Sequence, residues 1–233
     1  MNNYKVRRTI LKIPNQIAMD GTAASGKTTV GKIIAKKLGY IFFDTGIMYR
    51  VAAYSAVKQL GEVSDESKVS EIVEKMNIEL ESDAAQGTTN VLLDGKDITD
   101  KMHLPEVDKV VSIVAAYPAV RKALTEQQRR IGLKGKVVMV GRDIGTVVMP
   151  DAELKIYLAA SAETRAKRRY NENVANGITE ASYEEILEDI RKRDEADMNR
   201  KTAPLKPADD AVIIHTDDIS AEEVAEKIMK LME

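Results

Sequence analysis

Gly21-Thr22-Ala23-Ala24-Ser25-Gly26-Lys27-Thr28 has the spacing of a phosphate-binding loop, because two glycines separated by four residues are followed by lysine and threonine. Glycine lets backbone amides turn inward and approach a polyphosphate closely. In such a loop the lysine reaches the β- and γ-phosphates, and the hydroxyl after it holds Mg²⁺. The sequence therefore predicts a nucleoside triphosphate site from Gly21 to Thr29, with Lys27 on the phosphates and Thr28 on the metal.

The residues on either side of this loop supply the context that the motif requires. Residues 16–20 have the pattern of a short buried strand, and Gly39 is a helix stop. Between them, apolar residues recur at helical spacing, at Val30, Ile33, Ile34 and Leu38. The amino terminus of that helix adds partial positive charge to the site. A strand, a loop and a helix in this order favour a bound triphosphate over an ordinary glycine turn.

Strand patterns alternate with helical patterns along most of the chain. Further strands are predicted at residues 40–43, 136–140, 154–158 and 211–215. This alternation predicts an α/β fold of the P-loop NTPase type, with a parallel sheet covered by helices on both faces. Ligands of such sheets bind at the carboxyl ends of the strands. The glycine loop, Asp44-Thr45 and Gly141-Arg142-Asp143 each follow a strand, so we expect them to gather at one edge.

Residues 62–105 interrupt the alternation. They contain short apolar runs and Asp94-Gly95, which is a tight-hairpin signal. We predict a small inserted antiparallel subdomain here, with residues 1–61 and 106–233 as the core. A helical lid is expected at about residues 161–182, where a charged helix is followed by the polar break Asn176-Gly177 and a long helix starts near Ser182.

In that long helix, an apolar stripe turns into charged residues. The stripe consists of Tyr183, Ile186, Leu187 and Ile190, and the same spacing leads on to Arg193, Asp197 and Arg200. The preceding helix groups Arg165, Arg168 and Arg169 in the same way. Spacing alone leaves two interpretations open for each group, a wet cleft for anions or an ordinary solvated salt-bridge face. Arginine suits the cleft, because its planar fork grips phosphate oxygens.

The composition argues against several other kinds of site. The 233 residues include 35 lysines and arginines and 37 acidic residues, so a general nucleic-acid binder is not expected. The lack of cysteine excludes disulfides, thiol catalysis and cysteine-bound zinc. We interpret His103 and His215 as structural or surface residues. No apolar run approaches a membrane span, and residues 1–11 lack the core of a signal peptide. We expect a cytoplasmic monomer that needs neither nucleic acid nor membrane.

Taken together, these motifs resemble those of the bacterial cytidylate kinases, in the nucleoside monophosphate kinase group. The resemblance runs from about Gln16 to the C-terminus. It rests on Asp20-Gly21 through Thr29; Asp44-Thr45-Gly46 with Tyr49-Arg50; Ser112 with Ala115-Ala116-Tyr117-Pro118 and Arg121; Gly141-Arg142-Asp143-Ile144-Gly145-Thr146-Val147-Val148; and Arg193-Asp194 with Asp197, Asn199-Arg200 and Ala203-Pro204-Leu205. The insert also lies where that family enlarges its monophosphate-binding domain.

The resemblance implies transfer of the γ-phosphoryl group of ATP to CMP or dCMP, with Mg²⁺ as cofactor. It implies that Arg50 and Arg142 hold the acceptor phosphate, and that the cytosine edge is read by Ser112, Arg121 and Asp143. The pocket around the acceptor's sugar and phosphate would be lined by Thr45, Tyr49, Arg193, Asp197 and Arg200. Arg165 and Arg169 would come down with the lid onto the donor phosphates. The catalytic residues would be Lys27, Arg142, Arg165 and Arg169.

Two positions depart from the family pattern. An acidic residue usually precedes the Gly-Arg-Asp segment, and here that residue is Val140. We therefore restrict the metal's protein ligand to Thr28, with Asp44 as a candidate that acts through water, and expect a small shift in activity or metal dependence. The second departure is Thr22, where relatives often have proline, and the loop motif tolerates it.

Three rival functions differ from this one in testable ways. Another kinase of the same architecture would use UMP, AMP or a non-nucleotide acceptor, but the Gly-Arg-Asp segment combined with Ser112 and Arg121 argues against it. A regulatory GTPase would carry Asn-Lys-x-Asp and Asp-x-x-Gly signatures, which are absent. A non-catalytic nucleotide-binding scaffold would not need both an intact Lys27-Thr28 and a full set of arginines.

Overall fold

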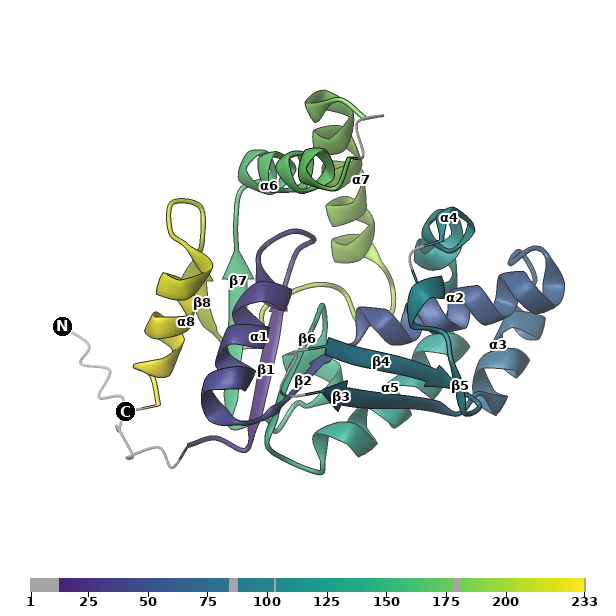
Figure 1. The fold of residues 1–233 in the computed structure, drawn as a ribbon, viewed down its shortest axis with the longest axis horizontal. Coiled ribbons are helices and arrows are strands. Elements are labelled where there is room, and N and C mark those ends of the chain that lie inside the picture. Colours follow the sequence, from purple (N-terminus) through teal and green to yellow (C-terminus); the bar gives the residue numbers. More distant parts are fainter. Residues whose placement is uncertain (1–12, 84–87, 103, 178–180, 233) are drawn as a thin grey trace.

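In a computed structural model, the chain folds around a five-stranded parallel sheet (Figure 1). The structure describes residues 13–83, 88–102, 104–177 and 181–232, so the expectations for residues 1–11 and for His103 lie outside it. The strand order is β2-β6-β1-β7-β8, with bounds Ile41–Asp44, Val137–Gly141, Gln16–Gly21, Leu154–Ala159 and Val212–His215. Every pairing within this sheet is parallel, which confirms the predicted fold class.

Helices cover both faces of the sheet. On one face, α1 (Lys27–Leu38) and α8 (Ala221–Met229) pack against Ile17 and Met19 of β1. On the other, α2 (Gly46–Leu60) and α5 (Pro118–Gly132) share a cluster with Ala18 of the same strand. Successive side chains of a strand point to opposite faces, so β1 contributes to two cores. Its carboxyl end is thereby fixed between them, and the glycine loop with it.

The insert contains the predicted antiparallel sheet. After α3 (Glu66–Lys75), strands β3 (Ile78–Asp83), β4 (Thr88–Leu93) and β5 (Lys96–Asp97) pair in sequence order. Asp94 and Gly95 join β4 to β5 with φ of 50° and 76°, as a type I′ turn requires. Ile78 and Val91 belong to the same apolar cluster as α2 and α5. The insert therefore shares the core of that face.

Two helices stand over the carboxyl ends of the strands (Figure 1). They are α6 (Ala162–Ala175) and α7 (Tyr183–Asn199), and they pack on each other through a small cluster of Ala166, Ile186 and Ile190. Because Ile186 and Ile190 belong to this cluster, the predicted apolar stripe of α7 faces α6. Ser182 and Glu185 form a capping box at the start of α7. The last turns of α7 continue toward the carboxyl ends of the strands, and α4 (Pro105–Val114) packs against α2.

Candidate active site

The loop between β1 and α1 has a backbone that turns through left-handed conformations at Gly21, Ala24 and Gly26. Gly21 has φ of +150°, and a Cβ atom there would lie 2.4 Å from the carbonyl oxygen of Leu158 on β7. Gly26 has φ of +95°. The Lys27 Nζ atom donates to the Thr22 carbonyl oxygen at 2.6 Å and to Ser25 Oγ at 3.3 Å. The lysine therefore lies folded back onto the loop that it would serve.

Lys27 lies within electrostatic reach of arginines from other elements. Burial and the guanidinium of Arg142 lower the pKa of Lys27 to about 7, with Arg193 acting in the same direction. Desolvation and Arg142 likewise lower the pKa of Arg193, and Arg50 and Arg169 add to that effect. Arg142 and Arg193 therefore lie near Lys27, although the side chain of Arg193 is exposed.

Thr28 and Asp44 meet at the head of α1. The Thr28 hydroxyl donates to Asp44 Oδ2 at 3.0 Å, and Asp44 Oδ1 accepts from the Gly46 amide at 2.9 Å. Hydroxyl and carboxylate oxygens suit Mg²⁺, which keeps several waters and shares its coordination with substrate phosphates. Across the described ranges no group of three or more His, Cys, Asp or Glu could hold a metal alone. The two residues fit a magnesium ion held mainly by phosphates and water.

Val140, the departure from the family pattern, points under α1. Its side chain is buried, and a Cβ atom on Gly31 would lie 2.9 Å from Val140 Cγ1. The position belongs to the apolar core beneath the glycine loop's helix.

Charged side chains from three parts of the chain form an alternating network at the strand ends. Arg121 of α5 donates to Asp143, which follows β6, and Arg200 NH2 lies 3.8 Å from the same carboxylate. Arg200 NH1 lies 3.5 Å from Asp197, which also accepts from Arg142 Nε. Both Arg121 and Asp143 are buried. Asp197 and Arg200 at the end of α7 therefore meet the loop after β6, and an anion-binding cleft at this face stays a prediction.

Tyr49 and Thr45 adjoin this network. The Arg121 guanidinium carbon lies 5.3 Å from the centre of the Tyr49 ring, and burial raises the pKa of Tyr49 to about 12. The Thr45 hydroxyl donates to the Val140 carbonyl oxygen at 3.0 Å. The ring is therefore a neutral wall of the site at physiological pH.

Arg50 and Ser112 occupy the insert side of the site. Arg50 NH1 donates to the Met102 carbonyl oxygen at 2.8 Å and to Asp108 Oδ1 at 2.5 Å. Ser112 is exposed on α4, and in the described part of the chain no hydrogen bond joins its side chain to Arg121 or Asp143. The roles of Arg50 on the acceptor phosphate and of Ser112 at the cytosine edge stay predictions.

The arginines of α6 have separate surroundings. Arg165 is buried, donates to both Asp194 oxygens at 3.1 and 2.5 Å, and donates to the Ala23 carbonyl oxygen of the glycine loop at 3.2 Å. Arg168 is directed to the turn after β8, where it donates to the Thr216 hydroxyl at 3.2 Å and to its carbonyl oxygen. Arg169 is half-exposed and pairs with Glu172 on its own helix at 3.3 Å. Only Arg165 touches the loop directly.

Asp20 is a residue of the site to which sequence reasoning assigned no role. Its two carboxylate oxygens accept from the amides of Ile144 and Gly145 at 2.7 and 2.8 Å. Burial raises the pKa of Asp20 to about 6. The residue braces the turn that carries Arg142 and Asp143 against the end of β1. In the sequence, the only sign of this role was a carboxylate at the end of a strand pattern that is otherwise buried.

Comparisons with known proteins show the family of this chain. The family model described as cytidylate kinase matches residues 17–233. The chain belongs to the cytidylate kinase family. A cytidylate kinase of Bacillus velezensis is 46% identical over 217 residues, which cover 93% of this chain and 96% of that protein. One of Bacillus subtilis is 45% identical with the same coverage. A solved structure of an uncharacterized protein from Eubacterium ventriosum has a TM-score of 0.52 at 12% identity, covers 93% of this chain and 96% of its own, and shares the fold.

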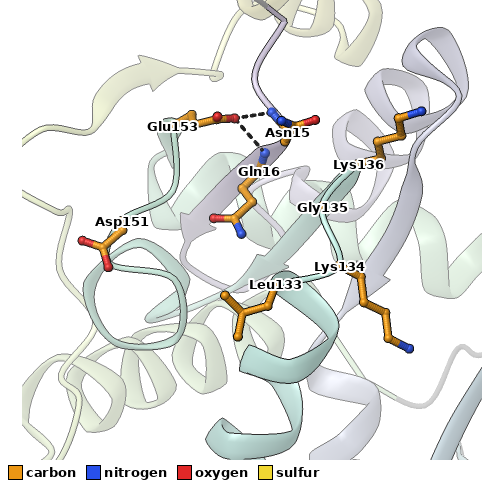
Figure 2. A pocket seen from close by; sticks show the side chains of 8 residues that line it. All are labelled: Asn15, Gln16, Leu133, Lys134, Gly135, Lys136, Asp151 and Glu153. Atoms are coloured by element: carbon orange, nitrogen blue, oxygen red, sulfur yellow. Dashed lines mark hydrogen bonds between the residues drawn. The ribbon is translucent and has the colours of Figure 1, made fainter.

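A hollow at the opposite edge of the sheet does not have this chemistry. It lies where β1 and β6 begin and is lined by residues around Asn15, Lys134 and Glu153 (Figure 2). The Glu153 carboxylate accepts from the backbone amides of Asn15 and Gln16, the latter at 3.3 Å. A carboxylate therefore already accepts from the backbone donors of this hollow. Among the described residues, no helix is long and apolar enough to cross a membrane.

Proposed function

We propose that the chain transfers the γ-phosphoryl group of ATP to the phosphate of CMP or dCMP, giving CDP or dCDP and ADP. One observation carries the proposal. The loop lysine, Arg142 and Arg193 lie within electrostatic reach of one another, next to the buried pair of Arg121 and Asp143. A cluster of cations beside a polar, buried recess suits two nucleotides that meet through their phosphates. Membership of the family supports cytidine nucleotides as acceptors.

On the donor side, the loop from Gly21 to Thr29 would cradle the phosphates of ATP. The amides at the head of α1 supply partial positive charge, and Lys27 turns from the Thr22 carbonyl oxygen to the β- and γ-phosphates. Phosphate near the Lys27 ammonium offsets its burial and restores the charge. A bound Mg²⁺, held through Thr28 and by Asp44 through water, would bridge phosphate oxygens and neutralise the charge that develops on them.

On the acceptor side, Arg50 and Arg142 would hold the phosphate of CMP. The Asp143 carboxylate can accept from the exocyclic amine of cytosine, and Arg121 can donate to its ring acceptors. UMP lacks that amine, and a site built to bind a donor rejects the analogue without it. The sugar would lie against Tyr49, with Thr45, Asp197 and Arg200 near it and Ser112 at the edge of the base.

Catalysis would consist of alignment and charge stabilisation. The acceptor is already a nucleophilic phosphate oxygen, so no general base and no covalent intermediate are needed. Lys27, Arg142 and Arg165 would stabilise charge on the transferring group, joined by Arg169 when the lid at about residues 161–182 descends. Closure would also exclude the water that otherwise hydrolyses ATP.

We further infer that the chain works in the cytoplasm as a monomer, without nucleic acid or membrane. The bounds 62–105 for the insert, within a core of residues 1–61 and 106–233, are part of the same proposal. Light scattering on the purified protein measures the oligomeric state.

A coupled assay of ADP release tests the activity. The purified chain is given ATP and Mg²⁺ with CMP, dCMP, UMP, AMP or GMP in turn. We expect ADP release that depends on the acceptor and is fastest with CMP or dCMP. Faster turnover with UMP or AMP would support the alternative of another P-loop small-molecule kinase, and no acceptor dependence would exclude a kinase of this kind.

A further inference from the structure

Asp108, to which neither the sequence motifs nor the proposed mechanism gives a role, contacts an arginine of the site. It lies in the first turn of α4, the helix that follows the insert and packs against α2 (Figure 1). Its Oδ1 atom accepts from Arg50 NH1 at 2.5 Å. The same NH1 atom donates to the Met102 carbonyl oxygen at 2.8 Å. Two acceptors on the insert side therefore hold one end of the Arg50 guanidinium.

The way Arg50 is held leaves one edge of its guanidinium for another anion. Within the described ranges, its hydrogen bonds engage NH1 alone, so the edge formed by Nε and NH2 makes none. A guanidinium has five donors in a fixed plane and binds phosphate best with two parallel N–H groups. Arg50 also contributes to lowering the pKa of Arg193, after desolvation, Arg142 and Asp197, which places it near the cationic cluster.

We propose that Asp108 is a positioning residue that fixes the Arg50 guanidinium so that its Nε and NH2 edge receives the phosphate of the acceptor nucleotide. The inference rests on the proposed function, because Arg50 is the acceptor-phosphate residue there. Asp108 acts through Arg50 and touches no substrate. Its contribution is preorganisation, since an arginine held in place loses less rotamer freedom when the phosphate binds.

The test is Asp108→Asn, which keeps the size of the side chain and removes its charge. We expect KM for CMP to rise about 2- to 5-fold, the upper part of the range of one ion-pair contact at a partly exposed site. KM for ATP and kcat at saturating CMP should change less than 2-fold. Glu106→Gln is the matched control, because it removes the same charge from the same helical turn, and Glu106 makes no ion pair with any described residue. It should leave every constant unchanged.

A double-mutant cycle separates positioning from a general effect of charge or folding. In an Arg50→Met background, Asp108→Asn should change KM for CMP less than 1.5-fold, because the residue that it positions is gone. An unchanged KM in the single variant would overturn the inference. So would a lower KM, which would mean that Asp108 competes with the phosphate, or an effect that persists without Arg50. Failure of the proposed function is distinct, because the parent enzyme would then lack CMP-dependent turnover.

Discussion

Lys27 destabilises the folded chain in the pH range where the enzyme would work. Its pKa is about 7 in the fold against 10.5 for a free lysine, so the unfolded chain binds this proton more tightly. Below pH 7 both states are protonated and the full destabilisation is present. Between about pH 7 and 10.5 the folded state has lost the proton, and the free energy of unfolding rises with pH.

Lys27→Met tests whether burial of the lysine lowers folding stability and whether the lysine is needed for turnover. We expect wild type to gain stability relative to the variant as pH rises from 7 to 10, measured by denaturant unfolding at each pH. Turnover of ATP with CMP should fall at least ~100-fold, which is about 2.7 kcal/mol of barrier. Lys36→Met, an exposed change on the same helix, is the control for both measurements. Parallel pH profiles, or near-normal turnover, would contradict the assigned role.

Arg121 should affect the acceptor and not the donor. Its guanidinium pairs with Asp143 and lies over Tyr49. We expect Arg121→Ala to raise KM for CMP at least 10-fold more than KM for ATP. Removing one partner of a buried pair should also lower stability by about 3 kcal/mol, so kinetics are measured well below the melting temperature.

Arg129→Ala is the matched control for that variant. Arg129 lies on the same helix and donates only to the carbonyl oxygens of Val147 and Val148 in the described structure. Its removal should leave both Michaelis constants unchanged. An equal loss of affinity for ATP and CMP in Arg121→Ala would place that arginine elsewhere than at the base.

At the level of elements, α6 and α7 form a unit with its own small core. Ile190 is buried in the cluster that joins the two helices. Ile190→Ala should leave a cavity that costs about 2–4 kcal/mol, and we expect the loss to appear as faster hydrogen exchange within residues 162–199. Ile228→Ala changes a buried side chain of α8 in the core that α1 and α8 form with the sheet. It should instead accelerate exchange across the sheet. Uniform acceleration in Ile190→Ala would show that the helix pair does not open as a separate unit.

Periodicity and turn chemistry predicted most of these elements because their causes are local. The strand before the glycine loop, the helix after it that ends at Gly39, and the Asp94-Gly95 turn all depend on neighbours in sequence. The partners of the arginines depend on tertiary contacts. Helical spacing grouped Arg165 with Arg168, yet one binds the glycine loop and the other the turn after β8. Helical spacing shows which residues share a face of a helix, but it does not show what that face packs against.

For the whole molecule, the arrangement of charge matters more than its amount. The net charge is −2, yet the structure gathers Lys27, Arg142 and Arg193 at one end of the sheet. Asp197 pairs with Arg142 and so offsets part of this charge. The remaining cations repel one another, and we expect an anionic ligand to relieve this repulsion. Ligand binding and folding stability should therefore be coupled through the same residues.

That coupling predicts how nucleotides change the melting temperature. A ligand present at 100 times its Kd adds about 2.7 kcal/mol, or roughly 5–10 °C for a chain of this size. We expect CMP to produce such a shift by calorimetry in 0.1 M salt. The shift should shrink as salt approaches 1 M, because the Debye length falls from about 10 Å to about 3 Å.

Arg50→Met links the shift to a single residue of the acceptor site. It should abolish most of the CMP shift and keep the shift produced by a non-hydrolysable ATP analogue, since Arg50 is assigned to the acceptor phosphate alone. Lys192→Met, which removes an exposed charge from α7, should keep both shifts. If CMP and the ATP analogue lost their shifts together in Arg50→Met, the two nucleotides would not occupy separate halves of the cationic cluster, and the arrangement of donor and acceptor proposed here would be wrong.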